Sequence, residues 1–375
     1  MPLNEDYAAD LGKRGAAIHA ILKEKGMYDE QKKYAVELHD GNVSYGEGYP
    51  IIGIEKFLGY YDGDLNIAYS PSISMTTDFS VAKAFCKYIS KENSDTVILD
   101  GKTDQRYSKR MAKALENFKR IAGVSGSFQF YVTRQRKYVE AKGLGESAAV
   151  AAATARSLVS NVFGKTAAAD RNFVSRCARL VSGSGTRSVA GGISLWMSYP
   201  GINEEECYAE RMDMDYSKLK IFTCPEKSNI ETINAHTAAV KSEFYQNWIS
   251  GKYDRIEKLA TTMPSIEEMG PLAEADMFRL DSVLMSSGAF VHNESSMRRI
   301  TTATSSRKEG CAVYITADTG PSVVVMSTYK QSLDEMVEIL DCKPLYGSVT
   351  DAPAGVAYKE DSKRAEEYFS SLETA

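Results

Sequence analysis

The sequence predicts an α+β protein with two domains, and three observations support that prediction. The chain has 375 residues, 43% of them hydrophobic and 25% charged, so it is long enough to build two cores. Short β-branched runs bounded by Asp and Gly alternate with Ala-rich stretches of helical periodicity. This mixture occurs in both halves of the chain, which indicates two α+β layers.

The first segment, residues 6–40, is predicted to form one or two helices. Ala, Lys and Glu are frequent there, and Leu11, Ile18 and Leu22 are spaced as on one helix face. Because the pattern changes at Tyr49, residues 1–48 are assigned to an N-terminal helical extension.

The first domain is predicted to span residues 49–205. The runs PIIGI, NIAYSPSISMTTDF and DTVILDG suit strands separated by turns. Residues from Lys109 to Ile121 have helical periodicity, and those from Ser127 to Val139 alternate like a half-exposed strand.

The second domain is predicted to span residues 206–375. It begins with the strand KLKIFTC, and helices are expected over 230–250, over 253–262 and in MFRLDSVLMSS. The strand CAVYITADTGPSVVVM is broken by Asp-Thr-Gly-Pro, which places the Asp318 carboxylate at a turn edge, a poor position for a core residue and a good one for a catalytic group. Residues 359–375 are rich in charge and are expected to be a frayed end.

Composition excludes several classes of partner. The net charge is -5 and the pI is about 5.6, so no overall positive field would attract nucleic acid or an anionic membrane. The first residues lack the features of a secretory signal, and no apolar run has membrane-spanning length. We therefore expect a cytoplasmic protein that holds any anionic ligand with local basic groups.

Cysteine and histidine usage predicts neither a metal site nor a dense disulfide framework. Four histidines and six single cysteines without a CxxC pair do not supply a zinc ligand set. We expect the cysteines to be small buried side chains, with a lone disulfide as the alternative. They are Cys86, Cys177, Cys207, Cys224, Cys311 and Cys342.

A glycine-containing turn precedes a run of good helix formers in KGLGESAAVAAATARSLVSNVFG. Gly143 and Gly145 lead into a helix predicted to start at Ser147, and a helix N-terminus offers free N–H groups to an anion. The alternative is that the glycines only permit close packing, since short glycine motifs are weak signals.

A second small-residue segment, SGSGTRSVAGGISLW, could present Ser182, Ser184 and Arg187 to an anion. The alternative is a flexible linker. The single arginine and the apolar run that follows it argue against a linker.

Five motifs in order resemble the diphosphomevalonate decarboxylases and their archaeal relatives in the GHMP kinase superfamily. The motifs are IIGIEKFLGYYD, SPSISMTT, GLGESAA, SRCARLVSGSGTRSVAGG and ADTGPSVVV, and they span Tyr49 to Met326. The resemblance implies a two-domain GHMP kinase fold with the active site in the interdomain cleft. It also implies a homodimer and a small phosphorylated mevalonate as the substrate.

The resemblance places the catalytic group on Lys56, Arg187 and Asp318. Loss of a phosphate and carbon dioxide from a tertiary carbon builds positive charge on carbon while negative charge leaves on phosphate, so two cations and one anion are required. Arg187 has a planar fork suited to a carboxylate, Lys56 is a point charge suited to phosphate, and Asp318 is the anion. An internal ion pair without substrate is the alternative, but such pairs rarely stabilise a fold.

The resemblance also implies a set of substrate-binding side chains. Two serines match those that hydrogen-bond the substrate carboxylate, one arginine matches a contact to its terminal phosphate, and the remainder lie in the SPSIS motif and the glycine loop. These residues are Ser182, Ser184, Arg106, Ser72, Ser74, Ser147 and Glu146.

Two departures from the family pattern bear on ATP. Tyr60 stands where kinase-type members carry a second lysine, and Glu146 stands where the decarboxylases have a serine. A carboxylate beside ATP phosphates would cost on the order of 1 kcal/mol if screened and several if dry. Against that, an archaeal mevalonate 3-kinase tolerates a nearby glutamate, and Glu146 could simply cap the helix. The extension before Tyr49 could also fill the space that adenine uses in kinases.

The expected reaction is decarboxylation of mevalonate 3,5-bisphosphate with loss of the 3-phosphate, giving isopentenyl phosphate without a cofactor. The first alternative is a decarboxylase of mevalonate phosphate or diphosphate that uses ATP and magnesium. The second is a mevalonate 3-kinase, but such kinases lack the lysine and aspartate found here as Lys56 and Asp318. The intact catalytic group argues against a non-catalytic binding protein.

Overall fold

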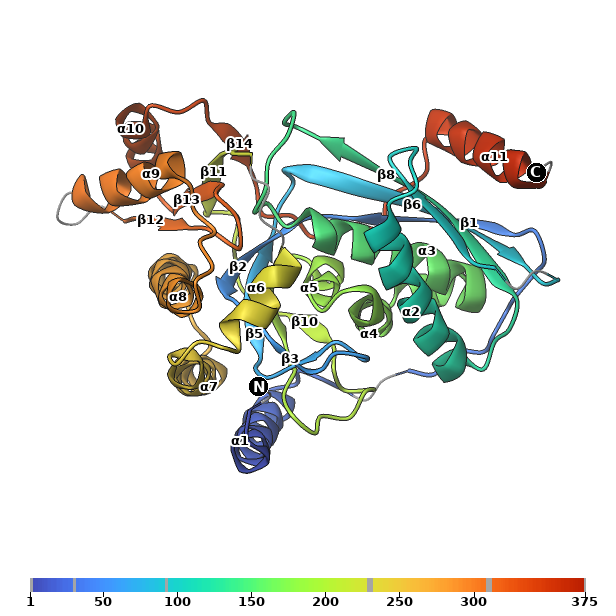
Figure 1. Cartoon of the computed structure of the whole chain (residues 1–375), viewed down its shortest axis with the longest axis horizontal. Helices are drawn as coiled ribbons and strands as arrows, with labels where there is room; N and C mark the ends of the chain where they lie inside the picture. Colours follow the sequence, from blue (N-terminus) through green and yellow to red (C-terminus); the bar gives the residue numbers. More distant parts are fainter. Residues whose placement is uncertain (1–2, 30–31, 92–93, 228–231, 308–311, 374–375) are drawn as a thin grey trace.

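Three four-stranded sheets and the helices packed on them make up the fold (Figure 1). The computed structural model describes every residue except 1–2, 30–31, 92–93, 228–231, 308–311 and 374–375. Among the described residues, no helix is long and apolar enough to cross a bilayer.

The first sheet has the strand order β1-β6-β8-β7 and is antiparallel except for the parallel pair β7–β8. Side chains along its two long strands, β6 and β8, point alternately to the two faces of the sheet. Phe130 therefore faces α2 and α3 on one side, whereas Phe85 and Tyr131 face α11 on the other. The elements are β1 (Val43–Gly48), β6 (Ser80–Ile89), β7 (Thr96–Leu99), β8 (Ser127–Arg136), α2 (Gln105–Ala122), α3 (Glu146–Ala169) and α11 (Lys359–Glu373).

Two segments differ from expectation in this sheet. β1 lies within residues 1–48, the predicted helical extension, yet it is a strand that pairs with β6. The first sheet therefore begins at Val43, ahead of Tyr49. The frayed C-terminal end is a wrong prediction for Lys359–Glu373, since this segment is a helix whose Phe369 is buried against Phe85.

The second sheet, in the order β10-β9-β5-β2, forms the centre of the molecule and belongs to the largest core cluster. Its inner strands consist almost entirely of buried residues, as expected for strands covered on both faces. The elements are β2 (Ile51–Glu55), β5 (Ser72–Thr76), β9 (Ile193–Trp196) and β10 (Ala209–Arg211), with α4 (Arg171–Val181) and α5 (Gly185–Ala190) beside them and the short pair β3 (Tyr60–Asp62) and β4 (Ile67–Ala68) nearby.

The third sheet, in the order β12-β13-β11-β14, lies in the second half of the chain. The predicted single strand interrupted at Asp318 is instead two strands, β12 and β13, which pair antiparallel, and Asp318 lies in the turn that joins them. The helix expected to run from 230 to 250 is two helices, because the chain turns at Ser242 before α7 begins, and α7 then continues through the break predicted at residues 251–252. Residues 230 and 231 lie outside the described part. The elements are α6 (Thr232–Ala239), α7 (Tyr245–Thr262), α8 (Ile266–Ser286), α9 (Glu294–Ser305), β11 (Lys220–Cys224), β12 (Val313–Thr316), β13 (Val323–Ser327), α10 (Lys330–Leu340) and β14 (Leu345–Gly347).

The N-terminal helix α1 (Glu5–Glu24) joins the two halves of the molecule. It packs on α7, where Arg14 donates to Ser250, and against Tyr199 of the first half (Figure 1). The buried face of α1 has α7 and Tyr199 as its partners, and the expectation that a helix of the extension fills the space that adenine uses in kinases stays a prediction. The rest of the predicted helical segment, after Lys25, contains no helix in its described residues.

One disulfide joins Cys224 of β11 to Cys342 just after α10, with their Cα atoms 6.1 Å apart. The expectation of unpaired cysteines is wrong for this pair, because a strand and a helix distant in sequence bring the two side chains together. Cys86 and Cys207 are free and buried as expected, and Cys177 is free and half-buried. Cys311 lies outside the described residues.

Candidate active site

Gly53 of β2 is the point at which two predicted catalytic side chains meet. Its N–H donates to both Asp318 carboxylate oxygens, at 3.1 and 3.3 Å. A Cβ on Gly53 would lie 2.6 Å from Lys56 Cγ and 2.9 Å from Asp318 Oδ1. Only glycine leaves room for both side chains here. The sequence contained a signal for this residue, a glycine inside the buried strand PIIGI, but its role could not be inferred from that signal alone.

The Lys56 ammonium is held by neutral oxygens. Its Nζ donates to the Gly53 carbonyl at 2.9 Å and to Thr316 Oγ1 at 2.6 Å, with the Ala273 carbonyl at 3.5 Å. Lys56 is only 5% exposed. Since none of these three acceptors is charged, the ammonium is oriented but keeps its positive charge available to an anionic substrate.

The guanidinium of Arg187, on α5, packs against two aromatic rings. It donates to Ser72 Oγ and lies 5.0 Å from the Phe57 ring centroid and 5.6 Å from that of Trp196. Arg187 is 2% exposed, and its Nε has no hydrogen-bond partner in the described structure. Burial lowers the pKa of Arg187 to about 10, so the group remains a cation at neutral pH with a donor unused.

Burial and neighbouring charges compete over the ionisation of Lys56 and Asp318. Burial lowers the pKa of Lys56, and Asp318 opposes that shift. Burial raises the pKa of Asp318, and Lys56, the Gly53 N–H and Arg187 oppose it in turn. Each charged form therefore depends on the other, which is a frequent feature of catalytic sites.

Four of the predicted serines surround this group. Ser72 and Ser74 lie on the buried strand β5, where Ser74 is the register partner of Gly53. The Ser74 hydroxyl is buried and has no hydrogen-bond partner among the described residues, and the hydroxyls of Ser182 and Ser184 lie 2.9 Å apart at the α4–α5 junction. Part of the predicted loop SGSGTRSVAGGISLW is thus the helix α5, which carries Arg187. Ser182 and Ser184, just before this helix, are half-buried.

A buried charge network that the sequence did not reveal anchors the backbone at Lys56. The Lys56 N–H donates to Asp276 Oδ2 at 2.7 Å, and Lys252 Nζ lies 2.7 Å from Glu55 and 3.1 Å from Asp276. Burial opposes the charge on Asp276, but Lys252 and Lys56 outweigh it and lower its pKa to about 2. Burial also raises the pKa of Glu55, with Asp276 adding to the shift. No sequence pattern links β2 to α7 and α8 across some 200 residues.

Glu146 does not stand alone as a repulsive charge. It begins α3 and accepts hydrogen bonds from Arg136 Nη2 at 3.0 Å, Arg134 Nη1 at 3.1 Å and the Tyr138 hydroxyl at 2.7 Å. The expected repulsion between a bare Glu146 carboxylate and ATP is therefore weakened, because two arginines from β8 neutralise it. The N-cap position itself is Gly145, in the left-handed region.

The glycine loop before α3 is packed against other backbone. A Cβ on Gly145 would lie 2.1 Å from the Ile51 carbonyl oxygen, and one on Gly143 would lie 3.1 Å from Gly320. The preceding Lys142 N–H donates to the Glu226 carbonyl at 2.8 Å. The close-packing alternative therefore describes this loop well, because Ile51 of β2 packs on one side of it and Gly320 and Glu226 of the second half pack on its other parts.

The phosphate-binding arginine expected from the sequence, Arg106, lies on the exposed first turn of α2, where its N–H is capped by Asp104 at 3.0 Å. On α2, a contact to a predicted substrate-binding residue comes, one turn after Arg106, from Arg110. Its Nη1 donates to Ser147 Oγ at 2.9 Å. Sequence reasoning passed over Arg110 because nothing distinguished it from the other basic residues of the helix.

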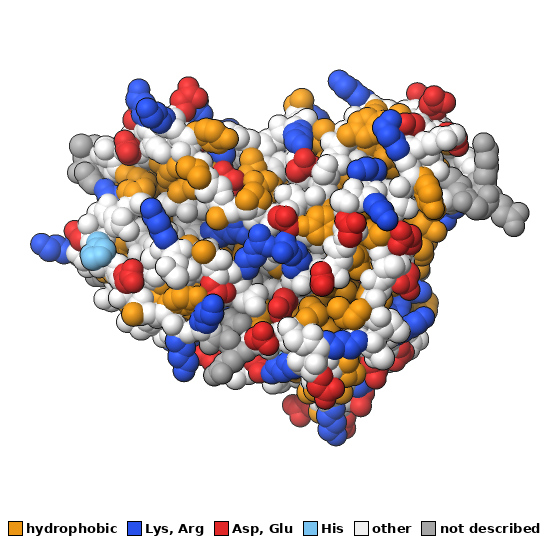
Figure 2. Space-filling view, turned by 180° about the vertical axis from the view of Figure 1, so that it is seen from behind, with side chains coloured by type: hydrophobic (Ala, Val, Ile, Leu, Met, Phe, Trp, Pro, Cys, Tyr) orange, Lys and Arg blue, Asp and Glu red, His pale blue; other side chains and the backbone are white. Residues whose placement is uncertain are grey.

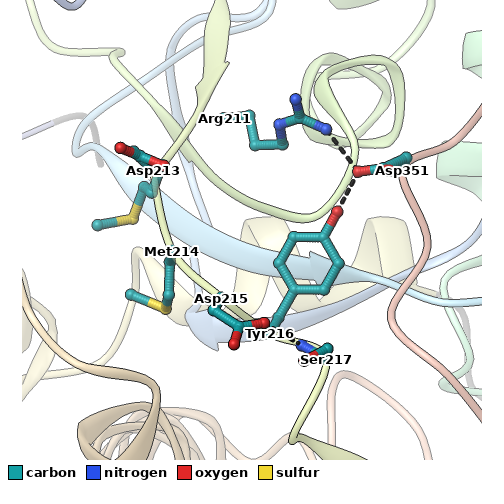
Figure 3. A pocket seen from close by; sticks show the side chains of 8 residues that line it. Arg211, Asp213, Met214, Asp215, Tyr216, Ser217 and Asp351 are labelled. Atoms are coloured by element: carbon teal, nitrogen blue, oxygen red, sulfur yellow. Dashed lines mark hydrogen bonds and ion pairs between the residues drawn. The ribbon is translucent and has the colours of Figure 1, made fainter.

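A separate hollow of about 430 Å³ lies at the opposite edge of the central sheet, beside β10 (Figure 3). Arg211 and Tyr216 both donate to Asp351 there. None of the predicted site residues lines it.

Lys and Arg side chains gather near the middle of the face that is turned away in Figure 1 (Figure 2). Local positive charge therefore exists despite the acidic net charge.

Comparisons with known proteins agree with this architecture. Residues 48–209 match the model of the diphosphomevalonate decarboxylase-like N-terminal domain. Over 361 residues, 96% of this chain and 89% of the relative, the chain is 42% identical to the mevalonate 3,5-bisphosphate decarboxylase of Thermoplasma acidophilum.

Solved structures share the fold at lower identity. Mevalonate diphosphate decarboxylase from Staphylococcus aureus superposes with a TM-score of 0.70 at 19% identity, over 82% of this chain and 96% of that one. The enzyme of the same name from Enterococcus faecalis, whose ATP binding mechanism has been described, gives 0.69 at 20% identity over 82% and 98%. The expected GHMP kinase fold is thereby confirmed.

Proposed function

The chain belongs to the family of mevalonate 3,5-bisphosphate decarboxylases, and we propose that Lys56, Arg187 and Asp318 carry out its reaction without ATP. The protein is a carbon–carbon lyase of the mevalonate pathway that acts on mevalonate 3,5-bisphosphate. The observation that supports the residue assignment best is the meeting of Asp318 and Lys56 over Gly53, with Arg187 close enough to influence the Asp318 pKa.

The reaction breaks two σ bonds and forms two π bonds, the C2–C3 double bond and the second C=O bond of carbon dioxide, which a lone pair of the carboxylate provides. The C3–O bond breaks with its electron pair leaving on phosphate, and the C1–C2 bond breaks to release carbon dioxide while its pair forms the C2–C3 double bond. Lys56 would hold the leaving phosphate, Arg187 would hold the carboxylate, and the Asp318 anion would face the electron-deficient C3. Such fixed charges are effective because the site is buried and little reorganisation is needed.

Independence from ATP is supported by how the glycine loop is held. A phosphate-binding loop must offer its backbone to the ligand, whereas this loop packs on Ile51 and Gly320 and its neighbour Lys142 bonds to Glu226. Glu146 and its two arginines form a closed ion-pair cluster at the start of α3. We propose that this packing, more than the charge of Glu146, prevents nucleotide binding.

The test is carbon dioxide release from mevalonate 3,5-bisphosphate with nucleotide removed enzymatically. We expect the same rate with and without magnesium-ATP. Calorimetry should detect no ATP binding at millimolar concentration, which corresponds to a binding free energy weaker than about -4 kcal/mol. The Enterococcus faecalis enzyme serves as the ATP-binding control. An absolute ATP requirement with mevalonate 5-diphosphate as substrate would contradict the proposal.

We propose further that the protein acts in the cytoplasm as a homodimer. A bisphosphate anion does not cross a bilayer unaided, so the enzyme must share a compartment with the one that makes its substrate. The dimer is supported by apolar side chains exposed just before α7, on α8 and after α8, namely Phe244, Phe278, Met285 and Phe290. Sedimentation equilibrium measures the mass, and a monomer at all concentrations would exclude the dimer.

A further inference from the structure

We propose that Asp276 is a positioning residue for the decarboxylation, because its carboxylate holds the main chain of Lys56 in the place that the reaction requires. The inference rests on the proposed function, since it assumes that Lys56 holds the leaving phosphate. Asp276 lies on α8 in the second half of the chain and is not one of the three residues to which the reaction has been assigned.

The main chain of Lys56 lies just past the end of β2. The last residue of the β2–β5 ladder is Glu55, and the next N–H, that of Lys56, donates to Asp276 Oδ2 at 2.7 Å. Gly53 is held in a similar way, because its N–H donates to Asp318. Two carboxylates of the second half thus hold the main chain at the end of this strand.

Helix α8 contacts Lys56 at both ends of the residue. Asp276 accepts from the N–H, and the carbonyl of Ala273, three residues earlier on α8, lies 3.5 Å from Nζ. The ammonium also donates to Thr316 Oγ1 at 2.6 Å. A change at Asp276 would therefore shift the ammonium relative to the substrate, and a displacement of about 1 Å can cost about 100-fold in rate.

The Asp276 carboxylate is itself held by three side chains of α7. Its Oδ1 lies 3.1 Å from Trp248 Nε1, 3.1 Å from Lys252 Nζ and 3.2 Å from Arg255 Nη2. Lys252 and Arg255 also pair with Glu55, so two carboxylates are matched by two cations. Asp276, Glu55 and Lys252 are fully buried. A buried network of this kind is weak evidence for stability, and what distinguishes this one is its contact with the proposed catalytic lysine.

The network also sets the charge balance around the Lys56 ammonium. Burial lowers the pKa of Lys56, and three carboxylates oppose that shift, namely Asp318, Asp276 and Asp281. The Lys252 ammonium adds to it. These groups come from the turn after β12, from α8 and from α7. Lys56 attracts phosphate only while it is protonated, so activity is lost as the pH rises through its folded pKa. Removing the Asp276 charge should move this loss to lower pH, and removing the Lys252 charge should move it to higher pH.

The substitution Asp276→Asn keeps the shape of the side chain and removes its charge. Each group that the structure places on this carboxylate is a donor, with the Lys56 N–H on one oxygen and the side chains of α7 on the other. An amide has to turn its NH2 group toward one of the two sides. Either the contact with Lys56 or the contact with α7 is therefore lost.

The test measures kcat and KM for mevalonate 3,5-bisphosphate against pH, without nucleotide, in Asp276→Asn and Lys252→Met. We expect Asp276→Asn to lower kcat by about 10- to 100-fold and to raise KM less, because the charge on the leaving phosphate develops in the transition state. The alkaline limb of its profile should lie at lower pH than that of the wild type, and the limb of Lys252→Met at higher pH. Asp254→Asn, on α7 with a side chain that is 72% exposed, is the matched control and should follow the wild type.

Removing one member of a buried ion pair can also unfold a protein, so thermal melting is measured for each variant. If Asp276→Asn does not fold, the double variant Asp276→Asn with Lys252→Met replaces it, since it removes one carboxylate and one cation together. Its kcat should be lowered, while its alkaline limb should return toward that of the wild type. A loss of activity due to instability alone would not move the two single variants in opposite directions.

Alkaline limbs that coincide with the wild type, or that shift in the same direction in both single variants, would overturn the role of Asp276. Lys56→Met tests the proposed function separately. If Lys56→Met turns over like the wild type, the proposed function fails first, and this inference with it. If Lys56→Met is inactive while Asp276→Asn keeps the wild-type rate and profile, this inference alone fails.

Discussion

The Asp318 carboxylate occupies an environment that opposes its own charge. Burial and the neighbouring Asp276 charge raise its pKa, and Lys56, the Gly53 N–H and Arg187 act in the other direction. A carboxylate in such a site is poorly solvated, so its interaction with a developing positive charge on the substrate is stronger than it would be in water.

We predict that Asp318→Asn lowers kcat by at least about two to three orders of magnitude, the effect of removing one preorganised electrostatic group. The amide keeps an oxygen that accepts from the Gly53 N–H, so the fold and substrate affinity should change little. Steady-state kinetics and calorimetry measure the two effects separately. Asp334→Asn, on the exposed face of α10 beside Lys330, is the control and should be neutral. Turnover within tenfold of the wild type would remove Asp318 from the mechanism.

Sequence motifs indicate Lys56, Arg187 and Asp318 as the proposed catalytic group, but they do not predict which residues hold these side chains in place. Lys56 donates to the Gly53 carbonyl and to the Thr316 hydroxyl. Such groups are too common in any sequence to mark a site. Asp276 supports it from 220 residues further along the chain, and no local periodicity records such a pairing. Charged and motif-forming residues could thus be predicted, whereas their neutral supports could not.

At the scale of elements, α1 provides one of the connections between the two halves of the chain. Tyr7 and Arg14 bond to α7, and Lys23 pairs with Glu206. Gly15 allows this helix to approach Tyr199, because a Cβ there would lie 2.3 Å from Tyr199 Cγ. The base of an aromatic ring cannot move aside as a flexible side chain can.

We predict that Gly15→Ala lowers the free energy of unfolding by about 1–3 kcal/mol, the usual cost of overpacking, although alanine is the better helix former by about 1 kcal/mol. Chemical denaturation measures the change, and limited proteolysis at Lys13 should become faster as α1 loosens. Gly251→Ala in α7 is the matched control. Its Cβ would meet only the Arg255 Nη1 atom at 3.2 Å, so this variant should be neutral or slightly stabilised. A stabilised Gly15→Ala variant would show that α1 is not tightly docked.

Element prediction succeeded where a pattern was strong and failed where packing decided the outcome. The alternation of Ser127–Val139 predicts β8, which ends at Arg136, and the periodicity of Lys109–Ile121 predicts α2, which begins at Gln105. The region of α6 and α7 was divided at the wrong place, since Gly251 is tolerated inside a helix that packs on α1 and α8. Lys359–Glu373 forms a docked helix because Ala365 and Phe369 are buried. The many charged residues around these two gave no indication of that burial in the sequence.

At the scale of the whole molecule, acid stability should depend on histidines that are buried in their neutral form. His19 of α1 is 2% exposed, with its Nδ1 3.2 Å from the Tyr199 hydroxyl and its ring 4.9 Å from that of Tyr28. Burial, reinforced by Lys23, lowers the pKa of His19 to about 4, and burial does the same to His236. Both groups therefore resist protonation in the folded state over a range in which an unfolded histidine takes up a proton.

The sign of the effect follows from proton uptake. Above about pH 6.5, the ordinary histidine pKa, His19 is neutral in both states and its contribution to stability is fully present. As the pH falls from 6.5 to about 4, the unfolded chain binds a proton that folded His19 does not, so the free energy of unfolding falls by up to about 3 kcal/mol for this residue. Denaturant titrations at pH 7 and pH 4 should show this loss in the wild type. The loss should be smaller in His19→Gln and unchanged in His39→Gln, which alters an exposed histidine. An identical pH dependence in the wild type and His19→Gln would mean that folded His19 protonates as readily as the unfolded residue.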